Sequence, residues 1–219
     1  AMAEYRVPLL VHGEVTDPEV EIFDREAVCI EHVLSPLLES LPGLIVVFEH
    51  LTTRQGVEFV LDAGENVAAT LTVHHLLLNR NAMFSKGLRP HHYCLPVLKR
   101  ESHRQALVEA AISGNPKFFL GTDSAPHDRA SKESSCGCAG IFSAPVAIEL
   151  YAQVFEDNNA LDRLEGFASI HGANFYGLPV NREKITLQRK EWRVPSKIMA
   201  GDEQIVPLCA GEKLIWQLK

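Results

Sequence analysis

Two histidines and one aspartate each follow an apolar segment that is as long as a β-strand. The segments are residues 5–11 before His12, residues 44–48 shortly before His50, and residues 117–120 shortly before Asp123. Imidazole and carboxylate groups are ligands that zinc and similar transition metals favour. A single histidine at a strand end is more often a hydrogen-bonded structural residue. The three together favour a metal site, provided that their strands end at one edge of a sheet.

The elements that must position these side chains alternate along the chain. A third apolar strand is predicted at 67–72. Helical spacing predicts a helix that starts at the Thr16-Asp17-Pro18 cap and runs to Leu41, and a second that is capped by Thr52 or Thr53. Further helices are predicted at 101–113, 144–157 and 160–170, followed by short strands near 185–187 and 214–216. This order predicts an α/β fold with parallel strands, which either an open doubly wound sheet or a closed barrel would satisfy.

Bulk composition narrows the class of protein. The chain has 219 residues, is 46% hydrophobic and carries a net charge of -7, so we expect one domain over residues 1–219 that binds neither nucleic acid nor a membrane. Residues 1–4 resemble no signal peptide and are interpreted as added ahead of the natural sequence. Five cysteines, an odd number, favour a reducing, cytoplasmic location.

The other cysteine and histidine pairs are expected to have structural roles or to lie in loops. Cys136 and Cys138 are separated by one residue, which is too close for the usual zinc-binding pair, and are interpreted as loop thiols. His75, of the adjacent pair His74-His75, is expected to be structural or to support a ligand. The pair 91–92 is expected in a loop near the mouth of the site.

Five separated segments together resemble the bacterial-type (class II) dihydroorotases. They are residues 11–14 (VHGE), 48–53 (FEHLTT), 93–100 (YCLPVLKR), 121–127 (GTDSAPH) and 132–140 (KESSCGCAG). The first segment alone would be weak evidence for the resemblance. The last two segments together are specific to this enzyme, and all five occur in the family's order.

The resemblance implies the amidohydrolase (β/α)8 barrel, of which this chain would be the C-terminal half: about four βα units followed by helices and a tail. It implies a site with two zinc ions that reversibly cyclises N-carbamoyl-L-aspartate to L-dihydroorotate in pyrimidine biosynthesis. His12, His50 and Asp123 match metal ligands, and Asp123 also matches the general acid–base. Leu95, His127 and Ala139 match positions that hold this small-molecule substrate.

The sequence departs from the family pattern in one respect. No His-x-His pair occurs in it, and the resemblance begins at the strand that is fifth in the family barrel. The chain alone is therefore expected to be inactive and to hold zinc weakly. Four strands would also leave an apolar sheet face and two strand edges open, so self-association as a homodimer or another oligomer is expected.

Two alternative functions stay open. Another cyclic-amide hydrolase, similar to hydantoinase or allantoinase, would use the same metal chemistry, although residues 132–140 argue against it. A non-catalytic half-barrel that binds a partner would explain the incomplete ligand set. The intact His12, His50 and Asp123 argue against this second alternative.

Overall fold

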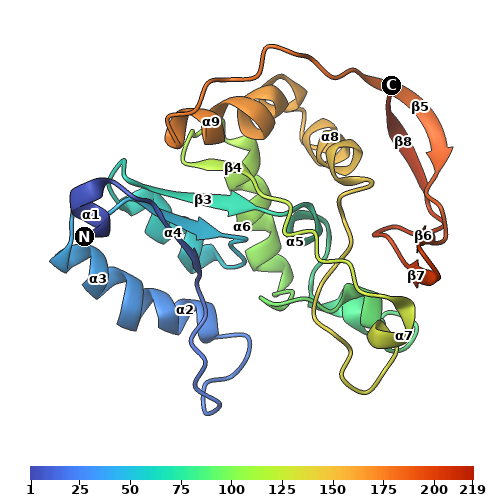
Figure 1. Cartoon of the computed structure of the whole chain (residues 1–219), viewed down its shortest axis with the longest axis horizontal. Coiled ribbons are helices and arrows are strands. Elements are labelled where there is room, and N and C mark those ends of the chain that lie inside the picture. Colours follow the sequence, from blue (N-terminus) through green and yellow to red (C-terminus); the bar gives the residue numbers. More distant parts are fainter.

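Four parallel strands form the central sheet of the computed structural model, which describes residues 1–219. The strands lie in the order β1-β2-β3-β4, with bounds Leu9–His12, Val46–Glu49, Val67–Leu71 and Phe118–Leu120. Helices lie between successive strands in the sequence, and Figure 1 shows them packed beside the sheet. The predicted α/β fold with parallel strands is confirmed, and β1 and β4 are its edges.

The first strand is shorter than the sequence predicted. Met2–Tyr5 forms a helical turn, α1, and the strand begins only at Leu9, which pairs with Val46. Pro8 precedes that pair, and a proline has no N–H with which to extend the ladder. The prediction of a strand from Tyr5 was therefore wrong at its start, whereas its end beside His12 is confirmed.

The first long helix also begins later than predicted. Helical structure starts with α2 at Arg25–Cys29, continues as a π-helical turn at Ile30–Leu34 (η1) and ends with α3 at Ser35–Ser40. The expected cap at Thr16-Asp17-Pro18 was wrong. The Asp17 carboxylate instead accepts from the nearby backbone N–H of Glu19, at 2.9 Å, which closes a turn.

The later helices follow the sequence pattern more closely. Thr53 caps a helix as predicted, since its side chain accepts from the Gly56 N–H. Several short turns, and the division of the predicted 160–170 helix, had no clear sequence signal. The helices are α4 at Arg54–Asp62, α5 at Val73–Leu77, η2 at Arg80–Met83, η3 at Pro90–His92, α6 at Glu101–Ile112, α7 at Arg129–Lys132, α8 at Ala147–Asp157, η4 at Leu161–Arg163, η5 at Gly166–Ile170 and α9 at His171–Phe175.

Both faces of the sheet bury apolar side chains. On one face Phe48 packs against Phe59 of α4, with ring centroids 6.3 Å apart. On the other, Phe119 packs against the rings of Phe175 and Tyr176, at 5.9 and 5.7 Å. Val47, Ala68 and Phe119 are at most 3% exposed on this second face. The expectation that this face would be bare was wrong there, because the end of α9 covers it.

Two antiparallel two-stranded sheets complete the chain. The strands β5 (Leu187–Arg193) and β8 (Lys213–Leu218) pair beside α8, as Figure 1 shows, and Trp216 donates from Nε1 to Glu156 at 3.1 Å. The smaller sheet is a hairpin of β6 (Ile198–Ala200) and β7 (Glu203–Ile205), and it was not predicted. None of the helices has the length and apolarity needed to span a membrane.

A buried carboxylate joins α2 to the start of α4. Glu26 is fully buried, and its two oxygens accept from the backbone N–H and hydroxyl groups of Thr52 and Thr53. Burial raises the pKa of this carboxyl, against the opposing effects of Lys99 and the threonine hydrogen bonds. This network fixes the segment that directly follows His50.

Replacing Glu26 with alanine is expected to lower the free energy of unfolding by about 3–5 kcal/mol, because four buried donors lose their acceptor. Urea unfolding of the two proteins measures this change. The matched variant Glu31→Ala removes an exposed carboxylate from the adjoining turn and should change stability by no more than about 0.5 kcal/mol. Equal effects of the two variants would show that the Glu26 network contributes nothing specific.

Candidate metal and substrate site

Two of the predicted metal ligands lie side by side. His12 ends β1 and His50 directly follows β2, the neighbouring parallel strand. Their rings meet edge to face, and His12 Nδ1 lies 3.1 Å from His50 Nε2. The parallel arrangement therefore brings residues 38 positions apart into contact at one edge of the sheet.

The nitrogen atoms fit a zinc ion. Two nitrogens that bind one tetrahedral zinc at about 2.0–2.1 Å lie about 3.3–3.4 Å apart, close to the observed separation of 3.1 Å. Burial lowers the pKa of His50 to about 4, which keeps its imidazole neutral and able to bind a metal near neutral pH. The imidazole pair therefore provides two ligands of the kind and spacing that zinc requires.

A carboxylate orients the more exposed histidine. Glu14 accepts from His12 Nε2 at 3.1 Å, which leaves Nδ1 facing His50. Lys99 lies 3.8 Å from the other oxygen of the Glu14 carboxylate, and the side chains of Glu14 and Lys99 are only 6% and 3% exposed. Carboxylates commonly fix a metal-binding histidine in this way. Glu14 lies in the 11–14 segment of the sequence, but no local pattern predicted a role for it.

Replacing Glu14 with glutamine should lower the pKa of His12 in the metal-free chain. The pKa of His12 is raised chiefly by its hydrogen bond to Glu14, against the opposing effect of burial, and the glutamine amide carries no charge. NMR titration of the His12 ring measures the change. Glu31→Gln, at an exposed position, is the control and should leave the His12 pKa in place. A His12 pKa that is the same in Glu14→Gln would contradict the orienting role.

Asp123 lies beyond the end of β4, at the same edge of the sheet. No hydrogen bond joins it to either histidine, but its charge helps to raise the pKa of His12. Loss of surrounding water raises its own pKa, against the lowering effect of His12. Both Asp123 and His50 have positive φ, at 38° and 40°. Such strain in residues other than glycine costs about 1–3 kcal/mol and is concentrated at functional sites.

Two of the three predicted substrate-binding residues are in direct contact. His127 Nε2 lies 3.0 Å from the Ala139 carbonyl oxygen, across the loop that contains α7. Leu95 is 37% exposed in a separate loop. The two loops meet near Leu95, because the Gly140 N–H donates to the Tyr93 carbonyl at 3.0 Å.

A buried lysine holds these loops together. Lys132 is 2% exposed and donates from Nζ to the carbonyls of Tyr93, Cys138 and Gly140, at 2.9, 2.6 and 2.8 Å. Burial lowers its pKa to about 8. Lys132 therefore fixes the backbone on either side of Ala139 to the backbone near Leu95. Its place at the head of the 132–140 segment was the only sequence signal, and it did not reveal this contact.

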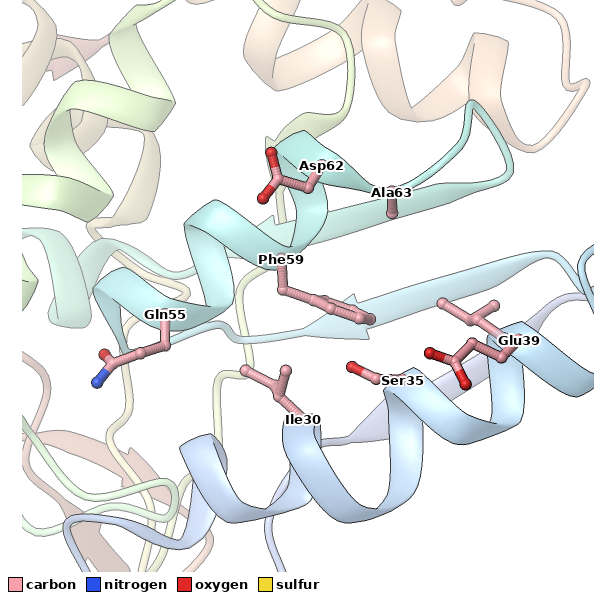
Figure 2. Close-up of a pocket in the computed structure, with 8 residues that line it drawn as sticks. Ile30, Ser35, Glu39, Gln55, Phe59, Asp62 and Ala63 are labelled. Atoms are coloured by element: carbon pink, nitrogen blue, oxygen red, sulfur yellow. The ribbon is translucent and has the colours of Figure 1, made fainter.

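A separate groove lies away from these residues. Figure 2 shows it between α3 and α4, where Phe59 lies across from Ile30 and Ser35, with Asp62 and Glu39 nearby. Its volume is about 560 Å³. It contains none of the predicted site residues, so the candidate site rests on the strand ends and the two loops.

The fold agrees with the comparisons with known proteins. The amidohydrolase family model matches residues 1–190, and the chain belongs to that family. A dihydroorotase from Nitrosomonas europaea is 62% identical over 217 residues, which are 99% of this chain and 62% of that protein. The chain thus spans less than two thirds of the length of this curated relative.

Two solved dihydroorotase structures have the same fold as this chain over its whole length. The crystal structure of dihydroorotase from Campylobacter jejuni aligns with all of this chain and 63% of its own, with a TM-score of 0.90 and 37% identity. The Saccharomyces cerevisiae dihydroorotase, solved with 5-fluoroorotic acid, aligns with all of this chain and 64% of its own, with a TM-score of 0.89 and 37% identity.

Proposed function

We propose that this chain forms part of a dihydroorotase, which interconverts N-carbamoyl-L-aspartate and L-dihydroorotate. The observation that carries the proposal is the 3.1 Å contact between His12 Nδ1 and His50 Nε2 at the carboxyl ends of adjacent parallel strands. The chain's similarity to dihydroorotases over nearly its whole length supports this choice among amidohydrolases.

The proposed cofactor is a pair of zinc ions, with His12, His50 and Asp123 among their ligands. When bound, zinc would make hydroxide available near neutral pH and polarise the ring amide carbonyl. Asp123 would take the proton of the attacking nucleophile and pass it to the departing amide nitrogen, and its raised pKa suits both steps. Glu14 would hold His12 in the orientation that presents Nδ1.

The proposed substrate contacts use the loops fixed by Lys132. His127 would bind a carboxylate of the substrate, and the backbone groups of Leu95 and Ala139 would bind the ring amide atoms. The His127–Ala139 contact supports this assignment, because one polar side chain and one of the two backbone positions already lie together.

We also propose that the protein is cytoplasmic and that it self-associates. All five cysteines are free, which supports a reducing, cytoplasmic compartment. The open edges β1 and β4, together with exposed Leu10 on β1, support self-association. Light scattering combined with hydrogen exchange at residues 9–12 and 118–120 tests this: a monomer with strong protection in both edge strands would contradict it.

Substrate choice tests the proposed function. We define the joined protein as this chain preceded by the part of the N. europaea dihydroorotase that lies before the aligned region. The joined protein is expected to hydrolyse dihydroorotate in the presence of zinc and to leave hydantoin essentially unchanged. A preference for hydantoin would replace the proposal with the other cyclic-amide hydrolase. A folded, zinc-loaded joined protein without either activity would favour a non-catalytic module.

A further inference from the structure

A second cluster of side chains that could bind a metal lies between α5 and the loop that carries Leu95. It shares no residue with the candidate site. His74, His75 and Cys94 each offer one ligand atom, and these atoms all lie within 4.8 Å of one another. All three residues are buried, at 0%, 2% and 1% exposure. His74 and His75 belong to α5, and Cys94 comes from the loop that carries Leu95.

His74 has no hydrogen-bond partner in this structure. Neither Nδ1 nor Nε2 of its fully buried ring meets a donor or an acceptor. A buried polar group left without a partner costs about 1–3 kcal/mol, so such groups are rare and usually contact an ion or a water. Burial lowers the pKa of His74 to about 3, which keeps the imidazole neutral, the form that binds a metal.

The remaining atoms have the spacing of a tetrahedral site. His75 Nε2 lies 3.7 Å from Cys94 Sγ and 3.0 Å from the Pro96 carbonyl oxygen, and Sγ lies 3.3 Å from that same oxygen. Ligands at the usual zinc distances of about 2.0–2.3 Å lie about 3.3–3.7 Å apart in a tetrahedron. These three pairs therefore need shifts of only a few tenths of an ångström, whereas His74 must move further.

From this geometry we propose that His74, His75, Cys94 and the Pro96 carbonyl bind one soft or borderline transition-metal ion such as Zn²⁺ or Cd²⁺. A thiolate with two imidazoles favours such ions over Mg²⁺ and Ca²⁺. In the metal-free structure His75 Nε2–H donates to the Pro96 carbonyl oxygen, so metal binding would shift the ring proton to Nδ1, which would then donate to the Thr72 hydroxyl oxygen 2.6 Å away. The Cys94 thiol loses its proton to solvent as the metal–sulfur bond forms.

The ion would fix the loop that carries Leu95. Cys94 and Pro96 flank Leu95 directly in the chain, and both would be held to α5 through the metal. Burial raises the pKa of the Cys94 thiol to about 12, so binding must displace a tightly held proton. Metal affinity should therefore fall as the pH is lowered.

Cadmium titration of the metal-free chain tests the site. Cys136, Cys138 and Cys209 are first replaced by serine, because these more accessible thiols would also bind Cd²⁺. The expected result is one Cd²⁺ per chain, a sulfur-to-cadmium charge-transfer absorption in the ultraviolet, and release of a proton.

Matched variants identify the ligands. Cys94→Ser should abolish the charge-transfer absorption, whereas Cys29→Ser, at the other buried thiol, should retain it. His74→Gln should weaken Cd²⁺ binding by at least roughly 10–100-fold, the loss usual for a residue that merely supports a ligand. His32→Gln, at an exposed histidine, should leave the affinity unchanged.

Three outcomes would overturn the proposal. They are a folded chain that shows no charge-transfer absorption, an absorption that persists in Cys94→Ser, and full Cd²⁺ affinity in His74→Gln. Replacement of both His12 and His50 by alanine distinguishes this site from the proposed catalytic one. Loss of the absorption in that variant would assign the metal to the catalytic histidines and would also overturn the inference.

Discussion

Replacing Asp123 with asparagine is expected to lower kcat for dihydroorotate by about 10²–10⁴-fold in the joined protein. The amide has nearly the same shape as the carboxylate but cannot accept the proton of the nucleophile. Because the strained backbone at φ 38° fixes this side chain at the strand end, a neighbouring group should not replace it. Steady-state kinetics with dihydroorotate, together with zinc analysis, measures the loss.

The control for this variant is Asp128→Asn. Asp128 lies in the same loop, and its side chain accepts from the Ser131 N–H to cap α7. Loss of the charge should lower stability by about 1 kcal/mol or less and leave kcat within a few-fold of the parent. An Asp123→Asn variant with nearly full kcat would remove the proposed acid–base role.

Replacing His50 with alanine should remove zinc as well as activity. His50 is buried, and its Nε2 lies 3.1 Å from His12 Nδ1. Removal of its ring therefore leaves His12 as the single imidazole at this zinc position. A zinc ion in a protein needs at least three protein ligands. The zinc content of the joined protein should fall by about one ion per chain, and dihydroorotate hydrolysis should become undetectable.

His32→Ala is the matched control, because this histidine is exposed in η1. It should retain both zinc and activity. A zinc content in His50→Ala equal to that of the parent joined protein would show that His50 is not a ligand.

The sequence predicted the parts of the site that depend on strand ends. Short apolar segments followed by His12, His50 and Asp123 are visible without a structure, and parallel strands end at one edge for topological reasons. The structure confirms that His12 and His50 meet. The caps were predictable where a threonine precedes a clear helical pattern, as at Thr53.

Contacts between distant segments could not be predicted from local patterns. The pairing of Glu14 with Lys99, the Lys132 contacts and the unpartnered His74 ring all depend on how loops pack in space. The coverage of Phe119 by Phe175 and Tyr176 likewise required the tertiary structure. The late start of α2 arises because Asp17 closes a turn instead of capping a helix, a choice that the cap pattern does not distinguish.

The most direct test of the central claim is a dihydroorotate hydrolysis assay of this chain and the joined protein, side by side, with added zinc. The chain alone supplies His12, His50 and Asp123 but no His-x-His pair, so we predict no measurable hydrolysis by the chain and clear hydrolysis by the joined protein. Activity of the chain alone within about tenfold of the joined protein, a difference of only about 1.4 kcal/mol in barrier, would contradict the account.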